Sequence, residues 1–182
     1  MKFVVGITGA SGLIYAERLL RFLSGTKHEA EVIVSAHARK VNEQECRMDF
    51  EAFGFPVHDD DAVSVPSLSG STRHDGCAIV PCSMATLGRI ASGVAATAIA
   101  RTADVCLKER RPLVLVVRES PYSLIHIRNM EQVTLAGAIV LPASPGFYTR
   151  PSGIEALVDT IVARVLDHLG VKHSLCPPWT PL

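Results

Sequence analysis

Short apolar runs alternate with segments of helical periodicity along most of this chain. Five runs rich in Val, Ile and Leu, at residues 3–8, 31–35, 77–81, 113–118 and 138–142, each end in a small, polar or proline-containing turn, which is typical of buried strands. Apolar residues three and four positions apart predict helices over residues 13–23 and 154–169. This alternation predicts an α/β fold in which helices cover both faces of a mainly parallel sheet.

Two segments lack either periodicity. Residues 53–71 are rich in Asp, Ser, Pro and Gly and predict a long irregular connection, a kind of loop that usually carries function or disorder. Residues 173–182 hold three prolines and the only tryptophan, Trp179, so we expect a tail that packs on a neighbouring subunit or is mobile. The length of 182 residues predicts one domain over residues 1–182.

Composition narrows the class of partner. The chain has 18 Lys and Arg residues against 18 Asp and Glu residues, so no net charge attracts nucleic acid or anionic lipid, and small-molecule partners are expected. No apolar run reaches the roughly 20 residues of a membrane span. The first residues enter a strand pattern without a signal peptide, which predicts a cytoplasmic location. Five cysteines without a Cys-x-x-Cys pair predict reduced, buried thiols and no metal site.

Candidate chemistry follows the predicted strands. Small and hydroxylated turns come after the first and third strands (residues 8–12 and 81–86), Ser35 after the second and the pair Arg118 and Glu119 after the fourth. Ligands of parallel sheets bind at this edge, and such turns before helices suit a phosphorylated cofactor. The acid that dinucleotide sites place after the second strand is replaced by Ser35, which favours a mononucleotide. Structural interpretations stay open: Ser35 and Ser83 as helix N-caps, and Arg118 with Glu119 as a satisfied pair.

A basic cluster precedes the fourth strand. Arg101 and Lys108 are seven residues apart, so they can share a helix face and offer positive charge to an anionic substrate. Arg110 and Arg111 are interpreted as a solvated helix end. The acidic run at residues 59–61 is interpreted as a solvated turn, because three consecutive side chains converge poorly on one ion. The seven histidines show no ligand spacing and are assigned to surface or structural roles.

Taken together, these motifs resemble UbiX-type flavin prenyltransferases, a branch of the flavodoxin-like flavoproteins, over nearly the entire chain. The resemblance is carried by residues 6–12 (GITGASG), 69–71 (SGS), 81–87 (PCSMATL), 103–113 (ADVCLKERRPL), 118–121 (RESP) and 145–148 (PGFY). It implies a Rossmann-like three-layer sandwich and an enzyme that joins a dimethylallyl group to N5 and C6 of reduced FMN without a metal. The product would be prenylated FMN for a separate UbiD-type decarboxylase.

The resemblance also implies roles for individual residues. The residues expected to bind FMN are Gly9, Ala10, Ser11, Ser35, Ser83, Met84, Ala85, Thr86 and Arg118. Those expected to hold dimethylallyl phosphate, in part across a subunit interface of a homododecamer built from trimers, are Ser69, Gly70, Arg101, Lys108, Glu119, Tyr148 and Arg164. Glu119 would be the acid and base, while Ser11 and Glu45 would lie near the reacting centre.

The chain also departs from the family pattern. Some members have a tryptophan shortly before the SGS turn, where this chain has Ala62 and Val63, and Thr102 stands where alanine is common. Three alternatives remain: oxidative decarboxylation of a cysteine, a flavin-dependent decarboxylase of aromatic acids, and an FMN-binding carrier module. The surplus of phosphate-directed groups argues against a carrier, and the absence of Asn from the turn at residues 82–86 argues against a cysteine decarboxylase.

Overall fold

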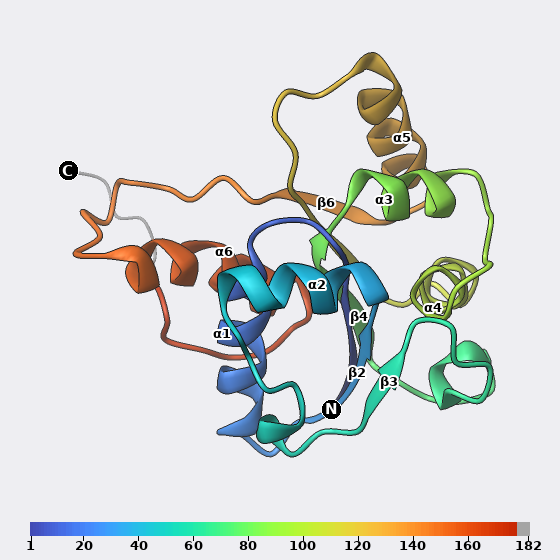
Figure 1. Ribbon diagram of the computed structural model, residues 1–182, viewed down its shortest axis with the longest axis horizontal. Helices are drawn as coiled ribbons and strands as arrows, with labels where there is room; N and C mark the ends of the chain where they lie inside the picture. Colours follow the sequence, from blue (N-terminus) through green and yellow to red (C-terminus); the bar gives the residue numbers. More distant parts are fainter. Residues whose placement is uncertain (178–182) are drawn as a thin grey trace.

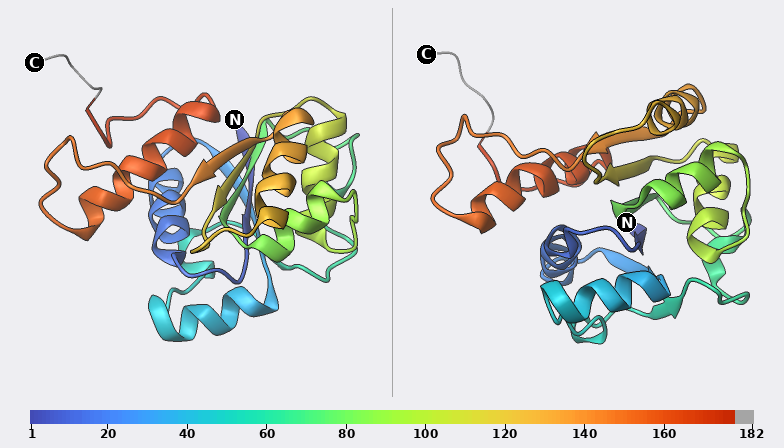
Figure 2. Two further views of the ribbon diagram at one scale, coloured as in Figure 1. Left: turned by 90° about the horizontal axis from the view of Figure 1, so that it is seen from above. Right: turned by 45° about the horizontal axis from the view of Figure 1, so that its top comes forward.

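A computed structural model describes residues 1–177 and shows a six-stranded sheet between two layers of helices (Figures 1 and 2). The strands are β1 (Lys2–Ile7), β2 (Glu29–Val34), β3 (Val57–Asp59), β4 (Gly76–Cys82), β5 (Leu113–Val117) and β6 (Ile139–Pro142). The helices are α1 (Leu13–Ser24), α2 (Ala36–Glu45), α3 (Met84–Ala91), α4 (Ala98–Lys108), α5 (Leu124–Leu135) and α6 (Ile154–His168), with short 3-10 turns η1 (Glu51–Phe53) and η2 (Pro66–Leu68). The predicted α/β sandwich is confirmed.

The strand order is β3-β2-β1-β4-β5-β6, and all five strand pairings are parallel. Every residue of β4 and β5 is buried, which explains why these strands read as continuous apolar runs. Because β1 and β4 are neighbours, the chain reverses its direction of travel across the sheet between them. Ligands of such sheets bind at this switch point, beyond the carboxyl ends of the strands.

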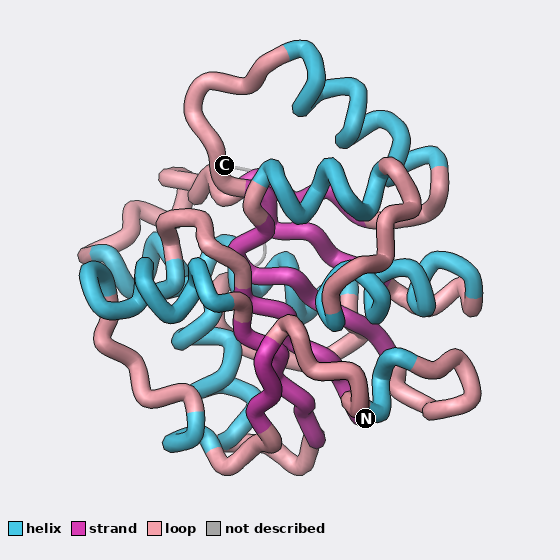
Figure 3. Tube along the Cα trace, turned by 45° about the vertical axis from the view of Figure 1, so that its right-hand side comes forward, coloured by secondary structure: helices cyan, strands magenta, loops and turns pink. Residues whose placement is uncertain are grey.

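The two faces of the sheet carry separate apolar cores. One core joins the sheet to α1, α2 and α6, and the other joins it to α3, α4 and α5. Figure 3 shows the strands enclosed between these two layers. Helices α4 and α6 therefore cover opposite faces, which separates the residues that each of them carries.

The sequence prediction missed one strand. The segment 53–71 was expected to be irregular, but residues Val57–Asp59 pair with β2 as the edge strand β3. Three residues with the sequence Val-His-Asp are too short for a periodic signal, and pairing with Val32, Ile33 and Val34 decides their conformation. The prediction for the tail at residues 173–182 stays a prediction, and Trp179 lies outside the described residues.

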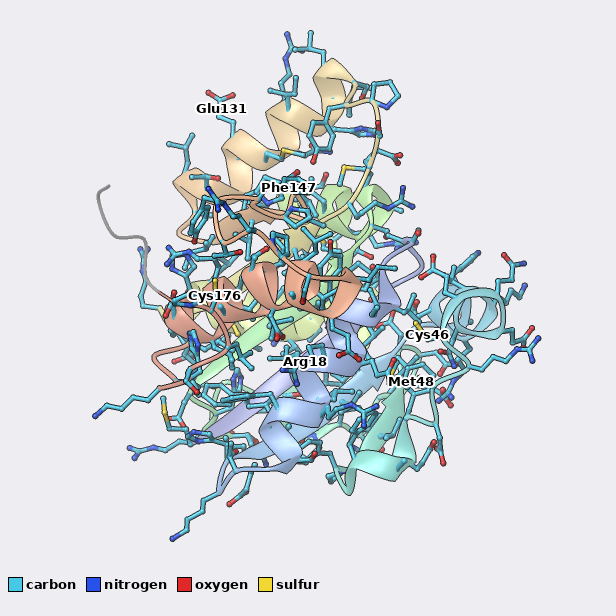
Figure 4. All side chains as sticks on the ribbon, turned by 90° about the vertical axis from the view of Figure 1, so that its left-hand side faces the viewer. Arg18, Cys46, Met48, Glu131, Phe147 and Cys176 are labelled. Carbon is cyan, nitrogen blue, oxygen red and sulfur yellow. The ribbon has the colours of Figure 1, made fainter. Side chains whose placement is uncertain are left out.

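The five cysteines are free thiols, as expected. Three of them are buried, and burial raises the pKa of Cys82 to about 12. Cys46 and Cys176 are only half-buried, which corrects part of the prediction, and they lie on different parts of the surface (Figure 4). None of the groups of His, Cys, Asp and Glu within residues 1–177 is arranged to hold a metal ion.

Candidate active site

Thr8 joins the two loops of the switch point. Its hydroxyl donates to the Pro81 carbonyl oxygen at 2.8 Å and accepts the Ser83 backbone N–H at 2.7 Å. The Thr8 side chain is 1% exposed, so these hydrogen bonds are shielded from water. The turns after β1 and β4 are thereby held in a fixed relation at the edge where a ligand is expected.

A cleft of about 720 Å³ opens at this edge. Its lining includes five residues expected to bind FMN: Gly9, Ser35, Ser83, Ala85 and Thr86. Thr8 belongs to the turn after the first strand, which was also expected at this edge. The remaining lining residues were not expected there: Ala36, His37, Arg39, Asp59, Asp60, Asp61, Arg89, Ala96 and Thr97. The turns after β1, β2 and β4 thus line one cleft, as predicted from the position of these turns at the carboxyl ends of parallel strands.

Ser35 and Ser83 are helix N-caps as well as cleft residues. The Ser35 hydroxyl accepts the Ala38 N–H at 3.1 Å, and the Ser83 hydroxyl accepts the Thr86 N–H at 3.3 Å. The N-cap interpretation is therefore confirmed for both serines, and both also line the cleft. The amino ends of α2 and α3 meet at the same cleft, and two helix dipoles favour a phosphate group there.

Gly9 occupies a position where no side chain fits. A methyl group at Gly9 would overlap the Cβ of His37 and would lie 3.1 Å from the His37 carbonyl carbon. The turn after β1 therefore packs directly against the first turn of α2. This close approach explains the glycine by packing as well as by access to a ligand.

The amino end of α1 is not free, which corrects the expectation that it offers N–H groups to a phosphate. The Glu45 carboxylate accepts the Gly12 N–H at 2.9 Å and the Leu13 N–H at 3.1 Å. Arg118 Nε donates to the Ser11 carbonyl oxygen at 3.1 Å. The fold thus brings together Ser11, Glu45 and Arg118, three residues expected at the site.

The environment of Glu45 lowers its pKa. Burial acts to raise the pKa, but hydrogen bonds from the Ser11 hydroxyl and the Gly12 and Leu13 N–H groups, with the charge of Arg118, outweigh burial. The carboxylate is therefore ionised at neutral pH and compensates the dipole of α1.

This shift predicts a pH-dependent contribution of Glu45 to stability. Since the folded pKa lies below the ordinary value of 4.5, the contribution is complete above about pH 4.5 and is lost as pH falls through the folded pKa. Glu45→Gln keeps hydrogen-bond acceptors but cannot ionise. Urea unfolding from pH 7 to pH 3 should show the variant less stable at pH 7 and the difference shrinking in acid. A difference that is constant across this range would contradict the prediction.

Arg118 and Glu119 form no ion pair with each other in the described part of the chain. Glu119 accepts the Ser120 N–H at 2.9 Å, while Arg118 holds the Ser11 carbonyl. Both side chains are half-buried beyond β5. The alternative of a mutually satisfied pair is therefore wrong, and both groups remain available to a ligand.

Two residues expected to bind FMN, Ala10 and Met84, are not among the residues that line the cleft. Ala10 is 6% exposed, and the Met84 side chain packs against the apolar core beneath α3, α4 and α5. Neither side chain lines the cleft. The Ala10 N–H donates to the Thr8 carbonyl oxygen at 2.9 Å, and Met84 is the first residue of α3.

The residues expected to hold the prenyl donor form two groups. Ser69 and Gly70 lie beside α4, where Arg101 and Lys108 pair with Asp104 and Glu109. Tyr148 and Arg164 line a different cavity of about 830 Å³ next to α6. A single chain does not bring the two groups together, because α4 and α6 cover opposite faces of the sheet.

Two sequence interpretations on the α4 side need correction. Arg111 is not a solvated helix end: its guanidinium donates to the carbonyl oxygens of Gly70 at 2.8 Å and Thr72 at 2.9 Å. Asp59 ends β3 and only Asp60 and Asp61 form a turn; Asp60 is half-buried and accepts the Ile99 N–H at 2.7 Å at the amino end of α4. Burial raises the pKa of Asp60, although the Ile99 N–H, the Thr97 side chain and the charge of Arg89 oppose the shift. No pattern in the sequence marked either residue.

Comparison with known proteins gives the family. The family model described as Flavoprotein matches residues 1–166. Flavin prenyltransferase UbiX from Methanocaldococcus jannaschii is 41% identical over 98% of both chains, and the Thermoplasma acidophilum protein of that name is 43% identical over 98% of this chain and all of its own. The chain belongs to the UbiX flavin prenyltransferase family.

Solved structures agree with this family membership. A crystal structure of AnUbiX (PadA1) in complex with FMN and dimethylallyl pyrophosphate superposes with a TM-score of 0.96 at 40% identity, covering 100% of this chain and 98% of that one. A dodecameric FMN-dependent UbiX-like decarboxylase from Escherichia coli O157:H7 gives 0.95 at 37% identity, with full coverage of both chains. The FMN-dependent cysteine decarboxylase TvaF, at 15% identity and 0.65, shares the fold alone.

Residues 1–177 contain no helix with the length and apolar character that crossing a membrane requires. The turns after β1, β2 and β4 of this flavodoxin-like sheet meet at one cleft. The residues expected to hold the prenyl donor, in contrast, lie in two separate places within one chain.

Proposed function

We propose that this chain transfers a dimethylallyl group from dimethylallyl phosphate to N5 and C6 of reduced FMN and so makes prenylated FMN. The observation that carries the proposal is the cleft at the switch point, where the capped ends of α2 and α3 meet, together with the contacts that join Ser11, Glu45 and Arg118 at the turn after β1. Full-length similarity to a structure holding FMN and dimethylallyl pyrophosphate supports the choice of ligands.

The residues of the cleft fit FMN. Ser35, Ser83 and Thr86 offer hydroxyl and backbone groups at two helix amino ends, where a phosphate monoester is stabilised. Gly9, Ala10, Met84 and Ala85 offer backbone at close range. Arg118, anchored on the Ser11 carbonyl, adds a positive charge at the edge of the site. Reduced flavin supplies the electron-rich ring atoms that accept the prenyl group.

The donor requires a different set of groups. When the allylic carbon–oxygen bond breaks, positive charge develops on the prenyl fragment and negative charge on the departing phosphate. Arg101, Lys108, Arg164 and the Tyr148 hydroxyl would stabilise the phosphate where this charge develops, with Ser69 and Gly70 completing its site. Glu119 would give a proton to the phosphate and later remove one from the adduct.

Assembly of several copies would complete the donor site. Leu124, Ile125 and Leu135 on α5 are 60%, 69% and 82% exposed, and Phe147 before α6 is 70% exposed. Figure 4 labels Phe147. Such apolar surface is typical of protein interfaces. We therefore propose a homododecamer built from trimers, in which Tyr148 and Arg164 of one copy approach Arg101 and Lys108 of another.

The proposed product, prenylated FMN, implies a partner protein that uses it as a cofactor. Prenylated FMN would serve a UbiD-type decarboxylase, with both proteins in the cytoplasm. The FMN-binding carrier and the flavin-dependent decarboxylase are the competing functions that the experiment must separate.

The experiment is anaerobic incubation of the purified protein with reduced FMN and dimethylallyl monophosphate, followed by mass spectrometry of the released flavin. A parallel arm uses the diphosphate, and a third arm omits any donor. A flavin heavier by one prenyl group in a donor arm is expected. Unmodified flavin in both donor arms with tight FMN binding would support a carrier, and release of carbon dioxide from an aromatic acid by this chain alone would support a decarboxylase.

A further inference from the structure

The carbonyl groups between η2 and β4 are held by two guanidinium groups. Arg101 Nε donates to the Leu68 carbonyl oxygen at 3.2 Å. Arg111 donates through Nη2 to the Gly70 carbonyl at 2.8 Å and through Nη1 to the Thr72 carbonyl at 2.9 Å. We call residues 69–72 the Ser69 turn. The carbonyl oxygens of Gly70 and Thr72 in this turn are both bound by Arg111.

The end of α4 determines where Arg111 lies. Its N–H donates to the Cys106 carbonyl at 2.9 Å, and Arg110 has a φ of 56°, so the helix closes with a left-handed residue before Arg111. Arg111 is half-buried, whereas Arg110 is exposed. The placement of the Arg111 guanidinium therefore follows from a rigid helix end.

The Ser69 turn is also anchored from inside the protein. Ser67, in the preceding η2, donates to the Glu31 carboxylate at 2.6 Å and lies 3.3 Å from the Thr102 hydroxyl. Glu31, Ser67 and Thr102 are 3%, 2% and 0% exposed. A buried carboxylate of this kind is tolerated only when hydrogen bonds satisfy it, so this contact holds η2 firmly to β2 and α4.

The exposed side of the turn offers donors. The hydroxyls of Ser69 and Ser71 are 2.8 Å apart and exposed. Lys108 lies so close to Gly70 that a methyl group there would meet its ammonium group and the Glu109 carboxylate. The turn is therefore a compact set of hydroxyl groups and a cation with its Gly70 and Thr72 carbonyls already occupied.

We propose that Arg111 is a positioning residue for the phosphate of the prenyl donor. Because C=O and the following N–H of a trans peptide point in opposite directions, binding the Gly70 carbonyl directs the Ser71 N–H away from the guanidinium and toward the Ser69 hydroxyl, to which it donates at 3.4 Å. Arg111 thus keeps carbonyl oxygens from facing the phosphate and holds Ser69 and Gly70 beside Lys108. The inference rests on the proposed function, which assigns the phosphate to Ser69 and Gly70.

The test compares the full-length wild type with Arg111→Ala, Arg111→Lys and Arg110→Gly. Arg111→Ala should raise the KM for dimethylallyl monophosphate about tenfold, with kcat within about twofold and FMN affinity unchanged. Arg111→Lys keeps the positive charge, but its ammonium group cannot bind both carbonyl oxygens as the planar guanidinium does. We therefore expect its KM for dimethylallyl monophosphate to rise about threefold. Arg110→Gly removes the neighbouring charge at a left-handed position that suits glycine, and its KM should equal that of the wild type.

Each outcome decides the proposal. An unchanged KM in Arg111→Ala, an equal rise in Arg110→Gly, or a parallel loss of FMN affinity would overturn it. If Arg111→Ala does not fold, the KM of Arg111→Lys decides alone. If the wild type makes no prenylated flavin, the proposed function fails, and calorimetric titration with dimethylallyl monophosphate then tests Arg111 directly: weaker binding by the Arg111 variants supports its role, and equal binding overturns it.

Discussion

Glu119→Gln is expected to lower kcat for prenyl transfer by about 10²- to 10⁴-fold and to leave FMN affinity unchanged. Glutamine keeps the oxygen that accepts the Ser120 N–H, so the loop after β5 retains its conformation. It has no carboxyl proton to give and no carboxylate to receive one. Single-turnover kinetics with prereduced FMN and dimethylallyl monophosphate, followed by mass spectrometry at each time point, measure this loss.

A matched control separates chemistry from a general charge effect. Glu131→Gln removes the same charge from α5, where the side chain points into solvent (Figure 4), and it should react at the wild-type rate. A Glu119→Gln rate equal to that of the wild type would remove Glu119 from proton transfer. A loss of FMN binding in this variant would instead make Glu119 a binding residue.

Gly9→Ala is expected to weaken FMN binding by about tenfold to a hundredfold. The added methyl group overlaps His37 Cβ, so the turn after β1 must move away from the first turn of α2. Overpacking of this kind costs about 1–3 kcal/mol, and each 1.4 kcal/mol is about a factor of ten in affinity. Titration of FMN with the protein, followed by flavin fluorescence, gives the dissociation constant.

Gly153→Ala is the control for this substitution. No atom lies within 4 Å of the position of its new methyl group, and its φ of -178° is extended backbone that any residue adopts. FMN affinity and thermal stability should stay at the wild-type values. Wild-type FMN affinity in Gly9→Ala would show that the turn tolerates a side chain and that its glycine is not needed for the ligand.

The sequence predicted the elements whose signals are local and repeated. Five of the six strands were predicted, with boundaries displaced by up to two residues, because parallel strands buried on both faces are continuous apolar runs. The N-cap positions of Ser35 and Ser83 are confirmed, because a hydroxyl directly before a helix is a local signal, while their role as FMN ligands stays a prediction. The edge strand β3 was not predicted, because three residues are too few to show the alternation of apolar and polar positions that marks a strand.

Some features of the candidate site were likewise predicted from the sequence, and others are seen only in the tertiary structure. Strand ends and turn composition were enough to determine that Gly9, Ser35, Ser83 and Thr86 meet at one edge of a sheet, since parallel strands place their carboxyl ends together. The carboxylate of Glu45 on the amino end of α1, and the grip of Arg111 on Gly70 and Thr72, join residues 32 to 41 positions apart in the sequence. Only the tertiary structure could decide such contacts, because a charged side chain takes its partner from whatever backbone the packing of helices and loops brings within reach.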